Sequence, residues 1–353
     1  LTRISKNVET GFLYTIGLPV KYLSHEWLDF FQQKFEKDES TRISPNETFA
    51  TKKIKSNRIV RELRLSPDEQ WTAYSVNYMG RIKVYLKNNN SGKNFSIYKQ
   101  GVRLDQITDY SYPIIAWHPT GKLVAFIVEK KGTKYLYTYE IETKELSFKE
   151  LFNVEKILDF SFSHNGFNLV LSAVKNGKTD IFVFNNAANS YEQITNDLAD
   201  DRYPQFIDLS SKIVFSSNRL SNTLPSDSMQ YNYDIFVYDY KNKSNELTRI
   251  TESPYADDIK PNYYAKNEFL LLSNPGGLYN KFIAKYDSTI SYIDTTTHYR
   301  YFTESKPLTN YSRNILDHSY SNTLKSSDLF YFKGLNFSQI NNIETTDLQL
   351  PNE

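Results

Sequence analysis

One short peptide recurs along the chain, and its recurrence limits the possible folds more than any other feature. It reads Ile-Thr or Leu-Thr followed by a polar residue, and it occurs at Ile107-Thr108-Asp109, Ile194-Thr195-Asn196, Ile250-Thr251-Glu252 and Leu308-Thr309-Asn310. The successive spacings are 87, 56 and 58 residues, the first being two units long. Such a period is typical of an architecture that builds one supersecondary unit several times.

Each unit continues with the same order of elements. After the tripeptide come a polar stretch, a β-rich run, a tight turn and a second β-rich run. Turns are marked at Ser66-Pro67-Asp68-Glu69, His118-Pro119-Thr120-Gly121 and Ser163-His164-Asn165-Gly166. Proline presets φ at the second turn position, and Asn-Gly and Thr-Gly tolerate the positive φ that follows. We therefore predict hairpins between the first two strands of these units.

A strand of strongly alternating polarity is predicted at the third place of every unit. The six segments are 82–86, 135–139, 180–184, 234–238, 281–286 and Asp328–Phe332. Six units of about four strands each predict an all-β fold, a six-bladed β-propeller, in which radial repetition protects the sheet edges. The expected blades are 50–107, 108–150, 151–195, 196–251, 252–308 and 309–345.

Composition agrees with a β-rich folded chain and excludes some classes of function. The 28 tyrosines and 23 phenylalanines are residues that half-buried strands favour. Lys and Arg number 42 against 41 Asp and Glu, so no global field attracts nucleic acid. The absence of cysteine excludes disulfides, thiolate metal sites and cysteine nucleophiles. The apolar runs are only strand-sized, so no segment is expected to span a membrane.

Residues 1–49 do not join the repeat and are predicted to be an N-terminal extension. An amphipathic helix of about four turns is expected within residues 21–40. Its apolar residues at helical spacing are Leu23, Trp27, Phe30, Phe31 and Phe35. This stripe favours a helix that packs on the propeller or is the remnant of a preceding domain, with a partner-binding helix as the alternative.

The propeller itself is expected over 50–345, followed by a polar tail over 346–353. The chain opens at Leu1 with neither an initiator methionine nor a leader. We therefore expect the mature or partial form of a longer protein, with a signal peptide lost upstream.

The stretch over residues 200–251 resembles a known repeat. It reads DDRYPQFIDLSSKIVFSSNR and then YDIFVYDYKNKSNELTRIT, which is similar to the repeat of TolB-like propellers, also called WD40-like or PD40 repeats. The matching positions are Asp201, Pro204, Phe206, Ser217, Arg219, Asp234, Ile235, Phe236, Asp239, Ile250 and Thr251. The family's Pro-Asp-Gly turn is partly kept in the first three units and lost in the last three. The resemblance covers about residues 50–340, and the Tyr- and Asn-rich usage also resembles large envelope proteins of Bacteroidota.

The resemblance implies a periplasmic or envelope-facing propeller that binds other envelope proteins through its face or central funnel. It would be a non-catalytic scaffold, for example in a secretion or outer-membrane assembly. Two alternatives stay open. One is the gating propeller of a prolyl-oligopeptidase-type serine peptidase whose hydrolase domain lies outside this chain, and the other is a glycan-binding or glycan-acting propeller.

No catalytic motif emerges from the sequence. Gly-x-Ser-x-Gly and Gly-x-Gly-x-x-Gly are absent, and Gly177-Lys178-Thr179 lacks the earlier glycine of a P-loop. His25-Glu26 begins like a zinc-protease motif, but Asp29 stands where the second histidine is needed. The chain is therefore predicted to be no enzyme, with no catalytic residue and no cofactor other than a possible Ca²⁺ ion.

Candidate binding residues fall into two groups. The acidic pairs Asp200-Asp201 and Asp257-Asp258 precede a proline at similar distances in adjacent units, and could form an acidic rim or a Ca²⁺ site. The favoured alternative is that these side chains cap loop backbone. The insertion 221–233 is the longest within a unit, and long loops on a rigid scaffold commonly bind partners. Its candidates are Pro225, Asp227, Met229 and Tyr231.

Overall fold

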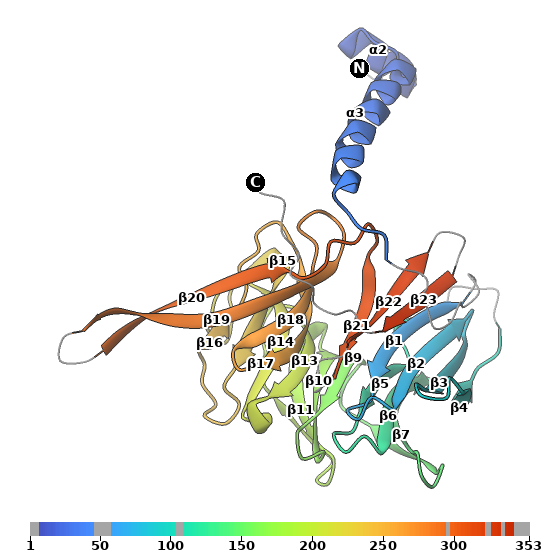
Figure 1. The fold of residues 1–353 in the computed structure, drawn as a ribbon, viewed down its shortest axis with the longest axis vertical. Helices are drawn as coiled ribbons and strands as arrows, with labels where there is room; N and C mark the ends of the chain where they lie inside the picture. Colours follow the sequence, from blue (N-terminus) through green and yellow to red (C-terminus); the bar gives the residue numbers. More distant parts are fainter. Residues whose placement is uncertain are drawn as a thin grey trace. The chain divides into compact units, whose positions relative to one another are not determined.

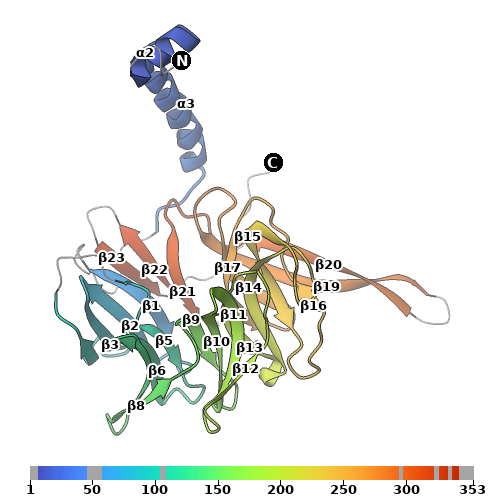
Figure 2. The same cartoon turned by 180° about the vertical axis from the view of Figure 1, so that it is seen from behind.

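The computed structural model describes residues 7–45, 58–103, 109–293, 297–321, 326–332 and 336–341. In this part of the chain the strands form five four-stranded sheets and one three-stranded sheet (Figure 1). Figure 2 shows the same sheets from behind. The predominance of antiparallel strands confirms the all-β class that the sequence predicts.

Each sheet is a meander, because its strands pair in chain order. The first sheet holds β1 (Ile59–Leu65), β2 (Trp71–Tyr78), β3 (Arg81–Asn88) and β4 (Asn94–Gln100). The second holds β5 (Ile114–Trp117), β6 (Leu123–Lys130), β7 (Thr133–Glu140) and β8 (Leu146–Leu151). The third holds β9 (Lys156–Phe162), β10 (Asn168–Lys175), β11 (Lys178–Asn185) and β12 (Ser190–Gln193).

The remaining sheets follow the same order. The fourth holds β13 (Asp201–Ile207), β14 (Lys212–Arg219), β15 (Met229–Tyr238) and β16 (Leu247–Arg249), with the 3₁₀ turn η2 (Asp208–Ser210) after β13. The fifth holds β17 (Asp258–Ala265), β18 (Glu268–Ser273), β19 (Asn280–Ile293) and β20 (Thr297–Pro307). The sixth holds β21 (Ile315–Tyr320), β22 (Ser326–Phe332) and β23 (Asn336–Asn341). The sheets fall in the six predicted ranges, except that β8 ends at Leu151 rather than residue 150.

The middle strands hold the sheets together because both of their faces are buried. In β6, Val124 and Phe126 pack into the core shared with the first sheet, whereas Ala125 and Ile127 pack into the core shared with the third. All four side chains have 0% exposure. Fully burying one valine, isoleucine or phenylalanine side chain contributes about 1.5–3 kcal/mol. The continuous apolar runs of the sequence thus reflect strands sandwiched between two neighbouring sheets.

The predicted turns between first and second strands are confirmed in the first three sheets. Ser66 Oγ donates to Asp68 Oδ1 at 2.5 Å and accepts the backbone N–H of Trp71 at 3.0 Å. In the third sheet Ser163 Oγ donates to Asn165 Oδ1 at 2.7 Å and accepts from Asn168 at 2.9 Å. The serine and the Asp or Asn two residues later therefore close the hairpin with the same hydrogen bonds.

The alternating strands predicted at third place are found there in the first five sheets. The prediction is wrong for Asp328–Phe332, which lies in β22 and pairs directly with β21 as the second strand of its sheet. The alternation of polarity could not distinguish the second strand of a sheet from the third, because both are interior strands that pair along both edges.

Two long strands depart from the predicted lengths. β19 was expected to end at Tyr286 but continues to Ile293, and it pairs with β20 as far as Thr297. Its other neighbour, β18, pairs with it only as far as Lys285. Beyond that point β19 and β20 form a two-stranded ribbon, which projects from its sheet in Figures 1 and 2.

The two helices belong to a separate compact unit that also includes Asn310–Ser312. The predicted helix is confirmed as α3 (Val20–Ser40), whose 21 residues exceed the expected length. A second helix, α2 (Val8–Ile16), was not predicted; Asn7 caps its start by accepting the N–H of Thr10 at 2.8 Å. None of the described helices combines the length and apolar composition needed to cross a bilayer.

In the stripe of α3, Trp27, Phe30 and Phe35 are exposed, at 61%, 63% and 58%, whereas Leu23 and Phe31 are half-buried. Its docking on the propeller stays a prediction. The predicted domain boundaries at 49/50 and 345/346 lie outside the described residues.

The recurring threonine joins strands through one repeated set of hydrogen bonds. Its hydroxyl donates to a side chain of the third strand, at 3.3 Å for Thr195 to Asp180, 3.3 Å for Thr251 to Asp234 and 3.0 Å for Thr309 to Asn280. The same hydroxyl accepts the backbone N–H of the following strand residue: Ile181 at 2.9 Å, Ile235 at 3.0 Å and Lys281 at 2.9 Å. These buried groups need partners, which explains why threonine recurs. Thr108 lies outside the described residues.

Replacing Thr251 by valine is expected to lower the free energy of unfolding by about 1–3 kcal/mol, because the N–H of Ile235 loses its acceptor and Asp234 loses a donor. Urea denaturation measures the change. The matched control is Thr248→Val on β16, since the hydroxyl of Thr248 lies outside this set of bonds. Equal stability of the two variants would contradict a structural role for the recurring threonine.

Candidate functional site

The innermost strand of each sheet borders a common channel. A bulge interrupts the pairing of β1 after Arg61, of β13 after Arg202 and of β17 after Ile259. Three residues at these bulges have a left-handed backbone that side chains rarely adopt: Glu62 (φ 57°), Tyr203 (φ 55°) and Lys260 (φ 54°). Bulges re-aim side chains, and strained positions of this kind cluster at functional sites. All three side chains help to line the channel.

The channel contains two cavities. One, of about 250 Å³, lies toward the ends of the inner strands, on the side we call the turn face because the first hairpin turns lie there. The other, of about 390 Å³, lies toward the starts of these strands, on the side we call the start face. Asp159, Tyr203, Lys260 and Asp317 line both cavities and form the boundary between them.

An ion-pair network occupies part of this boundary. Asp317 contacts Arg64 at 2.7 Å and Lys260 at 2.7 Å, and Arg64 also contacts Glu62 at 2.9 Å. Asp317 also accepts the backbone N–H of Leu63 at 2.9 Å. Burial opposes ionisation of Asp317, but Arg64 and Lys260 outweigh it and hold its pKa below the usual range. The network ties β1, β17 and β21 together across the channel.

Two charged groups of the wall are not part of that network. The carboxyl group of Asp159, on β9, makes no hydrogen bond or ion pair with another described residue. Burial and the nearby Glu62 raise the pKa of Asp159 to about 7, against the lowering effect of Lys260, Arg64 and Arg202. Arg202, on β13, has a buried Nε without a hydrogen-bond partner in the described part of the chain. The start-face cavity therefore contains a cation and a carboxyl group that the protein itself leaves available.

His318 does not have the surroundings of a catalytic base. It is buried, and its Nε2 lies 2.7 Å from the carbonyl oxygen of Lys260 and 2.9 Å from Nδ2 of Asn262. Burial and Lys281 lower the pKa of His318 to about 3, so the ring is neutral at physiological pH. Its contacts fix the position of β21 beside β17.

Aromatic side chains surround the turn-face end of the channel. Trp117, Phe162, Phe206 and Tyr320 come from β5, β9, β13 and β21 and are all half-buried. Together with the more exposed Tyr263 they border a further cavity of about 700 Å³ on the same side. Three of them lie at the strand position paired with the second residue of the next strand, as Trp117 with Val124, Phe162 with Leu169 and Phe206 with Ile213. We call these five residues the aromatic mouth.

The predicted acidic residues Asp200 and Asp257 occupy equivalent positions at the start face. Each donates its backbone N–H to an asparagine, Asn218 at 2.8 Å and Asn274 at 2.7 Å. Each side chain accepts a tyrosine hydroxyl, from Tyr233 at 3.3 Å and from Tyr279 at 3.2 Å. Asp257 also accepts the backbone N–H of Tyr233 at 3.2 Å. Asp200 therefore makes its contacts within the fourth sheet, whereas Asp257 also fastens the fifth sheet to the fourth.

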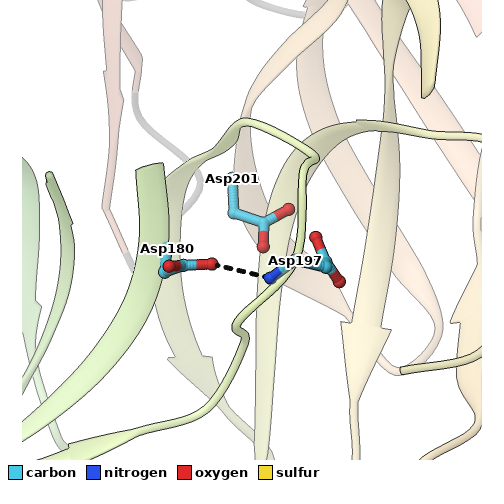
Figure 3. Close-up of side chains that lie close together, drawn as sticks. All are labelled: Asp180, Asp197 and Asp201. Atoms are coloured by element: carbon cyan, nitrogen blue, oxygen red, sulfur yellow. Dashed lines mark hydrogen bonds between the residues drawn. The ribbon is translucent and has the colours of Figure 1, made fainter. Parts of the chain in front are cut away.

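Asp201 belongs to a buried cluster with Asp180 and Asp197 (Figure 3). The three carboxylates lie close enough to hold a metal ion, but the guanidinium of Arg219 contacts Asp201 at 2.7 Å and Asp197 at 3.2 Å. Burial and the nearby Asp201 raise the pKa of Asp180 to about 6. The cluster already has an internal cation, so a Ca²⁺ ion would have to compete with Arg219. The Ca²⁺ interpretation stays a prediction.

The second acidic pair differs from the first. Asp258 is buried and accepts the hydroxyl of Ser253 at 2.8 Å, while its Oδ1 has no partner among the described residues. No arginine takes the place that Arg219 has beside Asp201, because Pro275 stands two residues after Ser273, where Arg219 stands two residues after Ser217. The two pairs are thus alike in position but unlike in chemistry.

The predicted insertion lies at the start face. Only part of it is a loop. Its first residues connect β14 to β15, whereas Met229 and Tyr231 already belong to β15. The four candidates are all exposed: Pro225, Asp227, Met229 and Tyr231. Ser226 between them donates its N–H to Asp197 at 2.9 Å, which fixes the loop to the buried acidic cluster. The binding role of these residues stays a prediction, and none of them lines the two channel cavities.

Sequence reasoning did not identify the channel residues Glu62, Arg64, Asp159, Arg202 and Lys260. The available signal was their position. Each precedes the first hairpin of its unit by a few residues, in the segment that becomes the innermost strand. Charges at equivalent places in several units of a repeat face the common axis, and this rule would have found them.

Comparisons with known proteins support the fold. Neither the protein-family models nor the curated proteins searched contain a match to this chain. Among solved structures, TolB from Acinetobacter baumannii superposes with a TM-score of 0.51 at 16% identity, over 81% of this chain and 64% of that one. The chain thus spans less than two thirds of that protein. A putative TolB from Agrobacterium tumefaciens gives 0.52 at 14% identity, over 71% and 78%.

A third likeness is to the β-propeller domain of the Trilobed protease from Pyrococcus furiosus, with a TM-score of 0.51 at 11% identity, over 84% of this chain and 98% of that one. Sheets arranged around a shared channel, together with these likenesses, define the chain as a β-propeller. The fold is similar to that of these TolB structures, in agreement with the resemblance of the repeat. At these identities the likeness establishes the fold and no particular activity.

Replacing Arg219 by methionine is expected to lower the free energy of unfolding by about 3–5 kcal/mol, because Asp197 and Asp201 remain buried without their cation. Urea denaturation measures this loss. The loss should be smaller at acidic pH, where the buried carboxylates take up protons. A loss below about 1 kcal/mol would show that the cluster does not depend on Arg219.

Asp159 makes the stability of the propeller depend on pH. Its pKa rises from 3.8 to about 7 on folding, so the folded state binds more protons than the unfolded state between these values. The contribution of Asp159 is therefore full below about pH 4 and is lost as the pH rises through 7. Asp159→Asn should melt at a higher temperature than the native protein at pH 8 and show a smaller difference at pH 4. Parallel melting profiles of the two proteins across this range would refute the shift.

Proposed function

We propose that this chain is a non-catalytic protein-interaction scaffold in the envelope of a Gram-negative bacterium, located in the periplasm or at the outer membrane. In this proposal its six sheets are the blades of one ring, and a partner protein docks on the aromatic mouth. The TolB-like fold supports an envelope location by analogy.

The aromatic mouth is the observation that carries the proposal. Trp, Tyr and Phe are enriched among the residues that dominate binding energy, because they bury a large area while losing few rotamers. Here five such residues border one cavity, and three of them come from the same register position of successive sheets. Several are fixed by neighbours: Trp117 Nε1 donates to the carbonyl of Arg64 at 2.9 Å, and Phe206 packs against Tyr240 with 5.7 Å between ring centroids. A rigid aromatic rim of this kind is suited to protein docking.

The non-catalytic part of the proposal is supported by the channel chemistry. The buried histidine of the channel is neutral and bonded to an amide and a carbonyl, not to a hydroxyl nucleophile. The ionised Asp317 is saturated by Arg64 and Lys260. These groups stabilise the ring instead of presenting a reactive pair to a substrate.

Affinity purification of the tagged full-length protein from detergent-solubilised envelopes tests this function. We expect one protein species to be recovered in stoichiometric amount with the native chain. The double variant Phe162→Ala/Tyr263→Ala should bind the partner at least about thirtyfold more weakly and recover correspondingly less, since each truncated anchor commonly costs about 1–2 kcal/mol. Phe148→Ala is the matched control, because Phe148 is equally aromatic and 65% exposed but lies on the outermost strand β8.

Both variants must melt within a few degrees of the native protein for the comparison to hold. Failure to recover any specific partner, or recovery that is indifferent to both variants, would argue against docking on the aromatic mouth.

A further inference from the structure

The start-face cavity differs from the aromatic mouth in its chemistry. Its volume is about 390 Å³, and its lining includes the cations Arg61, Arg202 and Lys260 and the acids Glu62, Asp159 and Asp317. Most of these have partners within the protein. Lys260 pairs with Asp317 at 2.7 Å, Glu62 pairs with Arg64 at 2.9 Å, and Arg61 donates to the carbonyl of Tyr110 at 3.0 Å. Arg202 and Asp159 are left over.

Arg202 is placed as an anion receptor. It is half-buried in the wall, forms no ion pair with a described residue, and its Nε is buried without an acceptor. A guanidinium is a planar fork whose N–H groups match the two oxygens of a carboxylate. A buried donor without an acceptor carries a desolvation cost that a ligand oxygen would remove. The guanidinium of Arg202 therefore faces the cavity with a donor that the described part of the protein does not satisfy.

Asp159 lies across the same cavity and sets the charge of the ligand. The groups that face it are Glu62 and Arg64 from β1, Arg202 and Tyr203 from β13, Lys260 from β17 and Asp317 from β21. With a pKa near neutrality, its carboxyl group is protonated below about pH 7 and can donate a hydrogen bond. A protonated acid and a guanidinium can both donate to one carboxylate. A dianion such as phosphate would meet one free positive charge and the nearby ionised Asp317, and is the poorer match.

We propose that the start-face cavity binds a single carboxylate group between the guanidinium of Arg202 and the carboxyl group of Asp159. This site is separate from the aromatic mouth, and it goes beyond the scaffold function because it does not require a partner there. The carboxylate can belong to a peptide or to a small organic acid, and both sources present the same chemistry. Binding is linked to uptake of a proton by Asp159 and weakens as that group ionises.

Two sets of probes test the proposal on the full chain. The first is a mixture of random hexapeptides with free C-terminal carboxylates, compared with the same mixture amidated at the C-terminus and with acidic residues replaced by their amides. The second is acetate, butyrate and benzoate, each compared with its amide by ligand-observed NMR. In at least one set we expect the acids to be preferred over the amides by about tenfold at pH 6, and less at pH 8. The set that responds identifies the source of the carboxylate.

Three variants locate the site. Arg202→Gln should abolish the preference for acids, and Arg202→Lys, which keeps the charge but not the fork, should retain part of it. Asp159→Asn should keep the preference but make it independent of pH, because the amide donates without titrating. Arg81→Gln is the matched control, since Arg81 lines neither channel cavity. Melting curves establish that each variant is folded.

Several outcomes would overturn the proposal. They are acids and amides bound equally or not at all by the native protein, an acid preference that survives in Arg202→Gln, and a native preference that does not change between pH 6 and pH 8. If Arg202→Gln fails to fold, the comparison of Arg202→Lys with Arg81→Gln decides the same question. Loss of acid binding with intact partner recovery, or the reverse, separates this site from the scaffold function.

Discussion

Burial of both faces of the middle strands is the constraint on which this molecule depends. Val124 and Phe126 on one side of β6, and Ala125 and Ile127 on the other, pack against different neighbouring sheets. The cores on the two sides of β6 are therefore shared with neighbouring sheets, and this apolar surface is covered only when those sheets are in place. This arrangement leaves the innermost strands facing one another across a channel. Because their channel-facing side chains are not needed for the apolar cores, those positions are free to carry charge.

The charged channel has a stability cost that the ion pairs only partly offset. Removing carboxylates and cations from water is unfavourable, and their mutual attraction repays this only with close geometry. The Arg64–Asp317–Lys260 contacts have that geometry. Asp159 and Arg202 do not, since neither has an ion-pair partner in the described part of the chain, and the raised pKa of Asp159 reflects the unrepaid cost of burial. Groups that are costly to the fold and unused by it are good candidates for a function.

The repeat was sufficient to predict the class of fold, most hairpins and the third strands, because period-two burial and turn chemistry are local properties of the sequence. It was also sufficient to single out the recurring threonine, although the hydrogen bonds to Asp180 and Asp234 became visible only in the structure. The misplaced strand was β22, where alternation could not separate two equally buried positions. The ribbon of β19 and β20 was missed because pairing between β18 and β19 ends at Lys285, and no local sequence signal shows that β19 continues beyond that point.

The candidate site was the least predictable part, since it depends on contacts between distant segments. Asp200 and Asp257 attracted attention because each begins an acidic pair, yet each side chain already accepts a tyrosine hydroxyl. Asp201 looked like a ligand until Arg219 was found beside it. Arg202 and Asp159, in contrast, are 43 positions apart in the sequence and isolated in their segments, and only the closure of the sheets around the channel brings them to one cavity.

The two ends of the channel therefore have different recognition chemistry on one scaffold. The aromatic mouth offers area and rigidity, which favour a protein surface. The start-face cavity offers one charge and one titratable donor, which favour a small, specific group. Four residues line both cavities: Asp159, Tyr203, Lys260 and Asp317. A charged ligand in one cavity therefore contacts residues that also line the other cavity. Asp317 on β21 holds Arg64 of β1 and Lys260 of β17 in place. Both cations also influence the pKa of Asp159 on β9, so a change in the protonation of Asp159 alters the electrostatic balance among these four strands.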